Sequence, residues 1–173
     1  MKYNVAQLLK EAIGSHRNFD IEEAICDADH PVEYVRGSVE MVRTHQGIWV
    51  QARLDVRVPQ DCSRCLEGFS RTFGIELDEE YFPEIDVKTG ARVLLPDDWE
   101  ALFISPDHNL DLAEATRQAT LAALPLKPLC RPDCVGICDR CGLDRNLGSC
   151  DCYNREIDPR WASLRLLMDE QQT

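Results

Sequence analysis

Apolar and polar residues alternate along the middle of the chain with the two-residue period of a β-strand. From residue 48 to residue 58 every even position is apolar, whereas the odd positions are polar or carry Trp49. This alternation over eleven residues predicts a long strand with one buried and one exposed face. Weaker alternation in residues 33–43 and 69–81, with a hairpin-like connection at residues 44–47, extends the pattern. The sequence therefore predicts an antiparallel meander of at least three strands.

Helical signals stand on both sides of this meander. Residues 5–13 place apolar side chains near helical spacing, and Gly14 ends the run. Residues 112–124 are rich in Ala and Leu and lie between a candidate N-cap, Asp111, and Pro125. We expect a short N-terminal helix and a second helix that leads into a cysteine-rich segment.

Two further stretches complete the expected organisation. Residues 83–109 are acidic and interrupted by prolines, which predicts loops around short strands at residues 93–95 and 102–104. Near the end of the sequence, Asp158 followed by Pro159 predicts the start of a last helix. The apolar stripe of this helix would consist of Trp161, Leu164, Leu167 and Met168.

Charge is distributed unevenly along the 173 residues, whose formal net charge is −12. Residues 76–114 hold twelve acids and two bases, whereas residues 36–71 and 127–165 carry small positive excesses of +2 and +1. This distribution argues against a non-specific nucleic-acid binder and confines any RNA contact to the latter two segments. Since no stretch approaches the roughly 20 apolar residues of a membrane span and the first residues lack the core of a signal peptide, we expect a cytoplasmic protein without a membrane partner.

Nine cysteines require a separate explanation, because a chain of this length can form a core without metals or disulfides. In a reducing compartment closely spaced thiols are metal ligands more often than disulfides. Gly142 can adopt the left-handed conformation that lets backbone amides face the thiolates. Cys26 stands alone, and the other eight predict structural Zn²⁺ sites, with one or two ions: Cys62, Cys65, Cys130, Cys134, Cys138, Cys141, Cys150 and Cys152.

The spacing leaves the partition of these eight cysteines open. The most economical partition forms a local site from Cys138, Cys141, Cys150 and Cys152, and a second site from Cys62, Cys65, Cys130 and Cys134. The main alternative is a single local site formed by Cys130, Cys134, Cys138 and Cys141. In either case four thiolates leave no open coordination position, which favours a structural role, and zinc binding of the order of 10 to 16 kcal/mol would order residues 126–157.

These features predict an α+β fold: an antiparallel β-meander, as a sheet or partial barrel, with flanking helices and a C-terminal cysteine-rich zinc-binding segment. We expect a single domain over residues 1–173, with a sheet and helix core in 1–125, the zinc segment in 126–157 and the C-terminal helix in 158–173.

No catalytic constellation is evident in the sequence. The four histidines are scattered, and Cys65 followed by Glu67 matches the zinc-deaminase C-x-E motif without its P-C-x-x-C partner. The C-x-x-C at Cys62 lies between two expected strands, whereas thioredoxin-like motifs lie in a βαβ setting. We therefore expect a protein that is not an enzyme. A zinc- or thiol-dependent enzyme, redox or hydrolytic, is the alternative.

One face of the long strand carries a candidate RNA-binding surface. Trp49, Arg53 and Arg57 share its exposed side, and an aromatic residue with arginines on an open sheet can stack bases and contact phosphates. The alternative is an ordinary solvent-exposed face or one covered by a helix. The acidic residues 76–114 are either a solvent-exposed segment or a contact for a basic ribosomal protein.

The ordered series of motifs resembles the YceD family, the large ribosomal RNA subunit accumulation proteins of bacteria and plastids. The resemblance spans about residues 3–168 and rests on four segments: D-C-S-R-C-L at 61–66, L-P-L-K-P-L-C-R-P-D-C-V-G-I-C-D-R-C-G at 124–142, N-L-G-S-C-D-C at 146–152 and D-P-R-W-A at 158–162. It implies a bacterial, non-enzymatic protein that supports 23S rRNA accumulation and large ribosomal subunit assembly, with no small-molecule substrate. The implied partners are the pre-50S particle, rRNA or a large-subunit ribosomal protein. Because the chain is acidic, we expect contact through a ribosomal protein or a small basic face.

Overall fold

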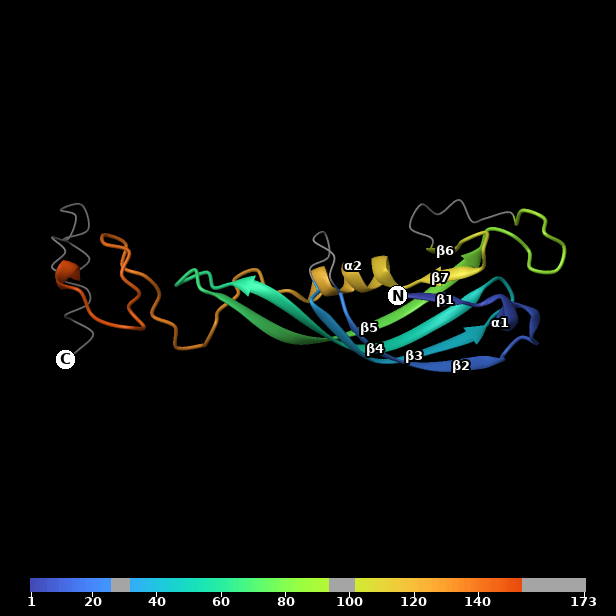
Figure 1. The fold of residues 1–173 in the computed structure, drawn as a ribbon, viewed down its shortest axis with the longest axis horizontal. Coiled ribbons are helices and arrows are strands. Elements are labelled where there is room, and N and C mark those ends of the chain that lie inside the picture. Colours follow the sequence, from blue (N-terminus) through green and yellow to red (C-terminus); the bar gives the residue numbers. More distant parts are fainter. Residues whose placement is uncertain (26–31, 94–101, 154–173) are drawn as a thin grey trace, which may run out of the picture. The chain divides into compact units, whose positions relative to one another are not determined.

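The computed structural model describes residues 1–25, 32–93 and 102–153 (Figure 1). The chain divides into two compact units, and the first comprises Met1–Asp61 and Gly68–Pro128. The second unit comprises Cys62–Glu67 and Leu129–Thr173, so a short internal turn belongs with the cysteine-rich segment. The single-domain organisation expected from chain length stays a prediction.

The first unit is built on an open five-stranded sheet with the order β2-β3-β4-β5-β6. Four strands follow one another as antiparallel neighbours: β2 (His16–Ala24), β3 (Tyr34–Arg43), β4 (Ile48–Asp61) and β5 (Gly68–Pro83). The short β6 (Leu102–Ile104) pairs in parallel with the end of β5. Among the described residues the sheet does not close, so the fold is the predicted sheet rather than a partial barrel.

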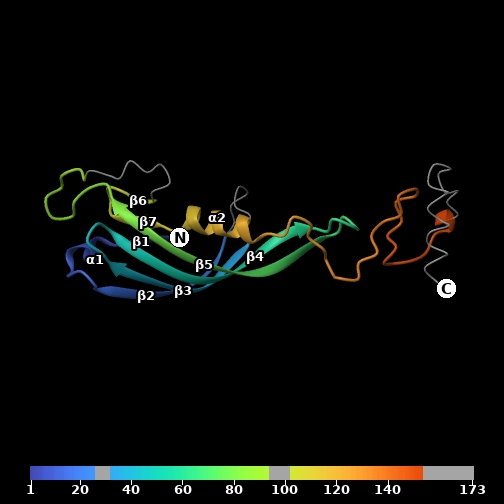
Figure 2. The same cartoon turned by 180° about the vertical axis from the view of Figure 1, so that it is seen from behind.

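Helices and a small second sheet lie on one side of this sheet. The second sheet pairs β1 (Lys2–Asn4) with β7 (Asn109–Asp111). Opposite views show α2 (Ala113–Ala123) on the same side as this pair (Figures 1 and 2). The remaining helices are α1 (Ala6–Lys10), near the beginning of the chain, and the 3-10 turn η1 (Asp151–Tyr153) in the second unit.

The core of the first unit lies between the covered face of the sheet and these elements. Every even position of β4 from 48 to 58 is buried and every odd position is exposed, as the alternation predicts. Leu8 and Leu9 of α1 and Ala115 of α2 join the same buried cluster. Full burial of a side chain such as Leu54 contributes about 1.5–3 kcal/mol, so the inward residues of β4 supply much of the stability of this unit.

Several predicted elements are confirmed with small shifts in their ends. The strands expected at 33–43, 48–58 and 69–81 are β3, β4 and β5, and the hairpin at 44–47 closes with a bond from the Thr44 N–H to the Gly47 carbonyl (3.1 Å). The helix expected at 112–124 is α2, and the Asp111 carboxylate accepts the Ala113 N–H (2.9 Å) at its start. The short strand expected at 102–104 is β6.

Other predictions were incomplete or cannot be compared. The helix expected at 5–13 is only α1, because the backbone becomes extended at Glu11, and β1 and β2 were not predicted. Val93 does not belong to a strand, and residues 94 and 95 lie outside the described ranges. The expected helix at 158–173 and Cys26 also lie outside them. None of the described helices is long and apolar enough to cross a membrane.

Candidate metal centres

Four cysteines from two distant segments converge in the second unit. Cys62 and Cys65 belong to the turn that joins β4 to β5, and Cys130 and Cys134 follow α2 in the chain. Their four sulfur atoms lie within 4.8 Å of one another, and this set is called the hairpin cluster. The sequence separations of 65 and 72 residues between contacting thiols show that the cluster links the hairpin turn to the cysteine-rich segment.

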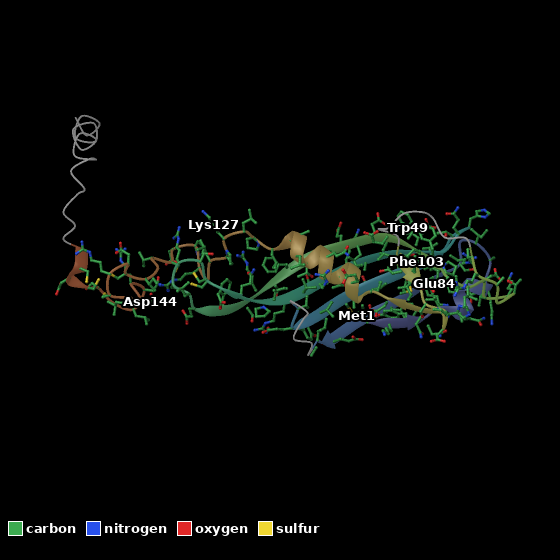
Figure 3. All side chains as sticks on the ribbon, turned by 90° about the horizontal axis from the view of Figure 1, so that it is seen from above. Met1, Trp49, Glu84, Phe103, Lys127 and Asp144 are labelled. Carbon is green, nitrogen blue, oxygen red and sulfur yellow. The ribbon has the colours of Figure 1, made fainter. Side chains whose placement is uncertain are left out.

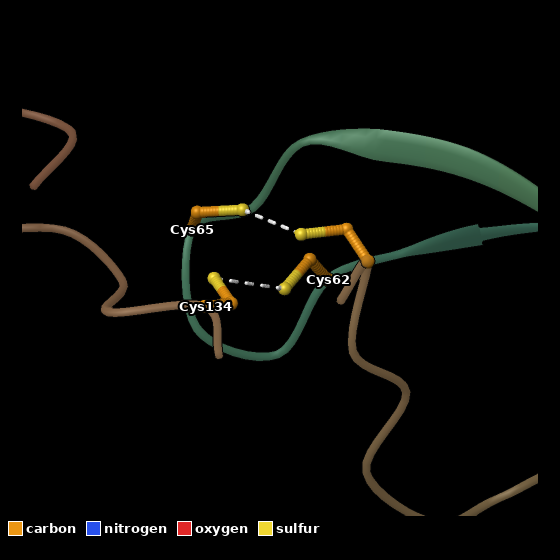
Figure 4. Close-up of side chains that lie close together, drawn as sticks. Cys62, Cys65 and Cys134 are labelled. Carbon is orange, nitrogen blue, oxygen red and sulfur yellow. Dashed lines mark hydrogen bonds between the residues drawn. The ribbon is translucent and has the colours of Figure 1, made fainter. Parts of the chain in front are cut away.

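The distances between the sulfur atoms of the hairpin cluster fit tetrahedral coordination of one metal ion. The Cys62 and Cys134 sulfurs are 3.8 Å apart, and the Cys65 and Cys130 sulfurs are 3.7 Å apart (Figure 4). Four sulfurs placed about 2.3 Å from a zinc ion lie about 3.8 Å from one another. Both distances are far longer than a disulfide bond of about 2.05 Å, and all four residues are free thiols. The donor set therefore has the chemistry and the spacing of a structural zinc site.

A second set of four cysteines lies within the cysteine-rich segment itself. The sulfurs of Cys138, Cys141, Cys150 and Cys152 also lie within 4.8 Å of one another, and this set is called the local cluster. The structure thus groups the cysteines in two fours, as one of the two partitions from spacing does. The alternative set, Cys130 and Cys134 with Cys138 and Cys141, is not brought together, because the first two meet the hairpin turn instead.

The hairpin cluster is supported by a tight backbone loop, the first knuckle (Cys62–Glu67). The Leu66 N–H donates to the Cys62 carbonyl (2.9 Å), and the Cys62 N–H donates to the Glu67 carbonyl (3.0 Å). Leu66 has a φ of +62°, in the left-handed region that a leucine rarely occupies. These bonds hold both sulfurs of the C-x-x-C pair on the inner side of the turn.

The local cluster contains the same loop, the second knuckle (residues 138–143). The Gly142 N–H donates to the Cys138 carbonyl (3.0 Å), and the Cys138 N–H donates to the Leu143 carbonyl (2.8 Å). Gly142 has a φ of +72°, which confirms the left-handed conformation predicted for it. The two knuckles therefore repeat one backbone design, with leucine in one where glycine stands in the other.

Two polar side chains around Cys134 were not identified from the sequence. The Asn146 Nδ2 donates to the Cys134 sulfur (3.5 Å), while its Oδ1 accepts the N–H of Val135 (2.9 Å). The Arg64 guanidinium donates to the Cys134 carbonyl (2.6 Å). Donors to a ligating sulfur orient it and tune its basicity. A single asparagine between two cysteine pairs carries no spacing signal, so only the structure shows its position.

The thiols of each cluster differ in acidity. Hydrogen bonds from backbone N–H groups, the largest effect coming from Cys130, lower the pKa of Cys62 to about 6. Burial, together with the neighbouring thiols, raises the pKa of Cys130. In the local cluster the backbone N–H of Cys141 likewise lowers the pKa of Cys138 to about 6. A divalent cation among the sulfurs favours the thiolate form of all of them, because its charge offsets their mutual repulsion.

The three residues of the candidate RNA surface lie on the exposed side of β4, as predicted. Trp49 is 36 % exposed and is the second residue of the strand; it is labelled in Figure 3. The Arg53 Nε lies 3.6 Å from Glu76, and the Arg57 Nε lies 3.7 Å from Glu33. Both guanidinium groups thus have carboxylate neighbours. RNA binding by this face stays a prediction.

Comparison with known proteins gives a family match. The family profile described as "Large ribosomal RNA subunit accumulation protein YceD" matches residues 50–168. An uncharacterised protein of Mycobacterium tuberculosis is 29 % identical over 143 residues, covering 82 % of this chain and 61 % of the relative. The "Large ribosomal RNA subunit accumulation protein YCED homolog 1, chloroplastic" of Arabidopsis thaliana is 24 % identical over 159 residues, covering 80 % of this chain and 50 % of the relative.

The chain therefore spans about half to three fifths of the length of these two relatives. No solved structure shows significant similarity to it.

Proposed function

Since the chain belongs to the YceD family, we propose that it is a non-enzymatic, zinc-stabilised protein that supports 23S rRNA accumulation and assembly of the large ribosomal subunit. The family is linked to large ribosomal RNA by its description, and the chloroplast relative carries the same name. The observation that carries the proposal is the extent of the match. Residues 50–168 include all but the first two residues of β4, the whole of β5 and all eight clustered cysteines.

Each cysteine cluster holds one structural Zn²⁺ in this proposal. Sulfur-only donor sets of four suit zinc, and such closed sites leave no position for water or substrate. The ligands are Cys62, Cys65, Cys130 and Cys134 in one site, and Cys138, Cys141, Cys150 and Cys152 in the other. In this role zinc cross-links the chain, and the backbone loops around the cysteines determine the shape of each site.

The described cysteine-rich segment depends on these cross-links. Between Leu129 and Cys150 the described chain contains no helix or strand, only turns and one isolated β-bridge, from Ile137 to Asp144. Apparent binding free energies of structural zinc, on the order of 10 to 16 kcal/mol, exceed what such turns contribute. Metal binding therefore fixes the knuckles in one conformation, which is a condition for recognising a partner.

The partner is a pre-50S particle, contacted through rRNA or through a large-subunit ribosomal protein. Sedimentation of the tagged protein with ribosomal particles, followed by crosslinking, tests this proposal. We expect the protein in pre-50S fractions, and we expect Cys138→Ser to lose this association together with its metal. If the wild-type protein sediments free of particles and its depletion leaves 23S rRNA unchanged, the proposed function is wrong.

A further inference from the structure

The face of the main sheet opposite its helices is uncovered by any described element. In both edge-on views α2 and the β1–β7 pair lie on the other side (Figures 1 and 2). The residues of β2 to β5 that point to this outer face are exposed or half-buried, and the registers of the three strand pairs align them in rows across the sheet. This face is therefore a continuous surface formed by four strands.

The outer face is acidic. It carries three guanidinium groups, from Arg36, Arg53 and Arg57, and eight carboxylates, which gives a net charge of −5. The carboxylates are those of Asp20, Glu22, Glu40, Asp55, Asp61, Glu76, Asp78 and Glu80. The arginines that suggested RNA binding from the sequence are thus a minority on their own surface.

The acids gather around a hollow in this face, the acidic trough. It has a volume of about 410 Å³ and is lined, among others, by Asn18, Asp20, Glu40, Gln51, Glu76 and Asp78. Among the described residues Arg53 is the only cation in its lining, and its Nε already lies 3.6 Å from Glu76. Within the described residues no ion pair involves Asp20, Glu40 or Asp78. The trough therefore presents unneutralised negative charge.

Two neighbouring features suit cationic side chains rather than a simple cation. Trp49 is directly paired with Glu80, one row along from the pair of Gln51 and Asp78, and an exposed indole attracts guanidinium and ammonium groups through its π face. The Gln51 Nε2 donates to the Asp78 carboxylate (3.4 Å), and its remaining N–H and its carbonyl, together with the amide of Asn18, can bond to the backbone of an extended chain.

From this arrangement we propose that the acidic trough docks an extended, Lys- and Arg-rich segment of a protein partner. Charge complementarity selects the partner: a surface with a net charge of −5 repels the phosphates of RNA and attracts a basic polypeptide. The inference rests on the proposed function and refines it. Proteins that bind rRNA neutralise its phosphates with Lys and Arg, and before they bind RNA their basic segments are free to contact an acidic surface. The protein then contacts the pre-50S particle, or delivers a component to it, through a basic protein chain.

Two variants with the same change in charge test the trough against net charge alone. Glu40→Gln with Asp78→Asn removes two of the four carboxylates that line the trough, and Glu22→Gln with Asp55→Asn removes two carboxylates of the same face outside it. The probe is a twelve-residue peptide of alternating Lys and Ser, and binding is measured by fluorescence anisotropy at two salt concentrations. We expect the trough variant to weaken binding by at least about fivefold, the control by less than about twofold, and higher salt to weaken both.

Three results of the binding measurements would overturn the inference. The first is equal loss in the two variants, and the second is no peptide binding by the wild-type protein. The third is tight binding of a 23S rRNA fragment that is lost in the Arg53→Glu, Arg57→Glu variant, which would assign the face to RNA. Sedimentation of the trough variant separates this inference from the proposed function: if the wild-type protein and the trough variant enter pre-50S fractions equally, the function stands and the docking surface does not.

Discussion

Three glycines of the second unit allow a graded test of the knuckle geometry. Gly136 and Gly142 have φ values of +76° and +72°, whereas Gly148 lies outside the left-handed region. A Cβ added at Gly142 or at Gly148 would meet no atom within 4 Å, but one at Gly136 would lie 2.9 Å from the Arg64 carbonyl oxygen. The three positions therefore separate backbone strain from steric contact.

The expected magnitudes follow from these differences. Alanine in place of glycine stabilises a compatible site by about 0.4–1 kcal/mol through the unfolded chain, so Gly148→Ala should be neutral or slightly stabilising. Left-handed backbone costs an L-residue about 1–2 kcal/mol, which leaves Gly142→Ala about 1 kcal/mol less stable. Gly136→Ala adds overpacking of about 1–3 kcal/mol to this strain, for a total of about 2–4 kcal/mol. It should also lengthen the bond from the Ile137 N–H to the Arg64 carbonyl, now 3.1 Å.

Competition with a zinc chelator measures these effects, because weakening the folded loop weakens its metal affinity. Every 1.4 kcal/mol corresponds to a factor of ten, so Gly142→Ala should release zinc several-fold more readily and Gly136→Ala about 30-fold or more. Metal loss in Gly136→Ala should begin at the hairpin cluster and in Gly142→Ala at the local cluster. If Gly136→Ala retains zinc as well as Gly148→Ala does, the close approach of this loop to the hairpin turn is wrong.

Four further changes test other parts of the structure. Val50→Asp should unfold the first unit, because an unpaired buried carboxylate costs several kcal/mol, whereas Arg53→Glu should change thermal stability by less than about 0.5 kcal/mol. Asn146→Ala should raise the zinc dissociation constant of the hairpin cluster by about tenfold or more in chelator titrations, since it removes the donor to the Cys134 sulfur. Cys138→Ser should speed limited proteolysis within residues 126–157 in step with metal loss; a cysteine variant that keeps metal and protease resistance yet loses turnover would establish the enzyme alternative.

The strands could be predicted where one face is buried and the other is exposed, because the sequence then alternates between apolar and polar residues. β4 has one wholly buried and one exposed face, so its period of two is unbroken for eleven residues. β2 was missed because its sequence lacks a clear two-residue alternation. Only Phe19 and Ile21 are large apolar residues that point inward, and the other residues of the strand are polar or exposed. β2 is an edge strand of the sheet, and a strand at the edge can be formed with fewer buried apolar side chains than a central strand.

The metal clusters could be predicted as a set of eight residues, and their division into two fours was the most economical partition but not the only one that the spacing allowed. Cys130 and Cys134 are as close in sequence to Cys138 as ligands of one site commonly are, so local spacing cannot decide between the partitions. What decides the grouping is that the turn with Cys62 and Cys65 folds together with the cysteine-rich segment in one compact unit, where these two residues complete a set with Cys130 and Cys134. The left-handed Leu66 had no sequence signal either, since glycine is the residue that marks such positions.

The zinc content of three proteins tests the two-site account most directly: the wild type, a Cys62→Ser, Cys65→Ser variant and a Cys150→Ser, Cys152→Ser variant. Elemental analysis of the purified wild-type chain should give close to two zinc ions, and each double variant should retain close to one. In the first variant Cys130 and Cys134 should become open to alkylation, while the local cluster stays protected. One zinc ion in the wild type, unchanged when Cys62 and Cys65 are replaced, would contradict the account.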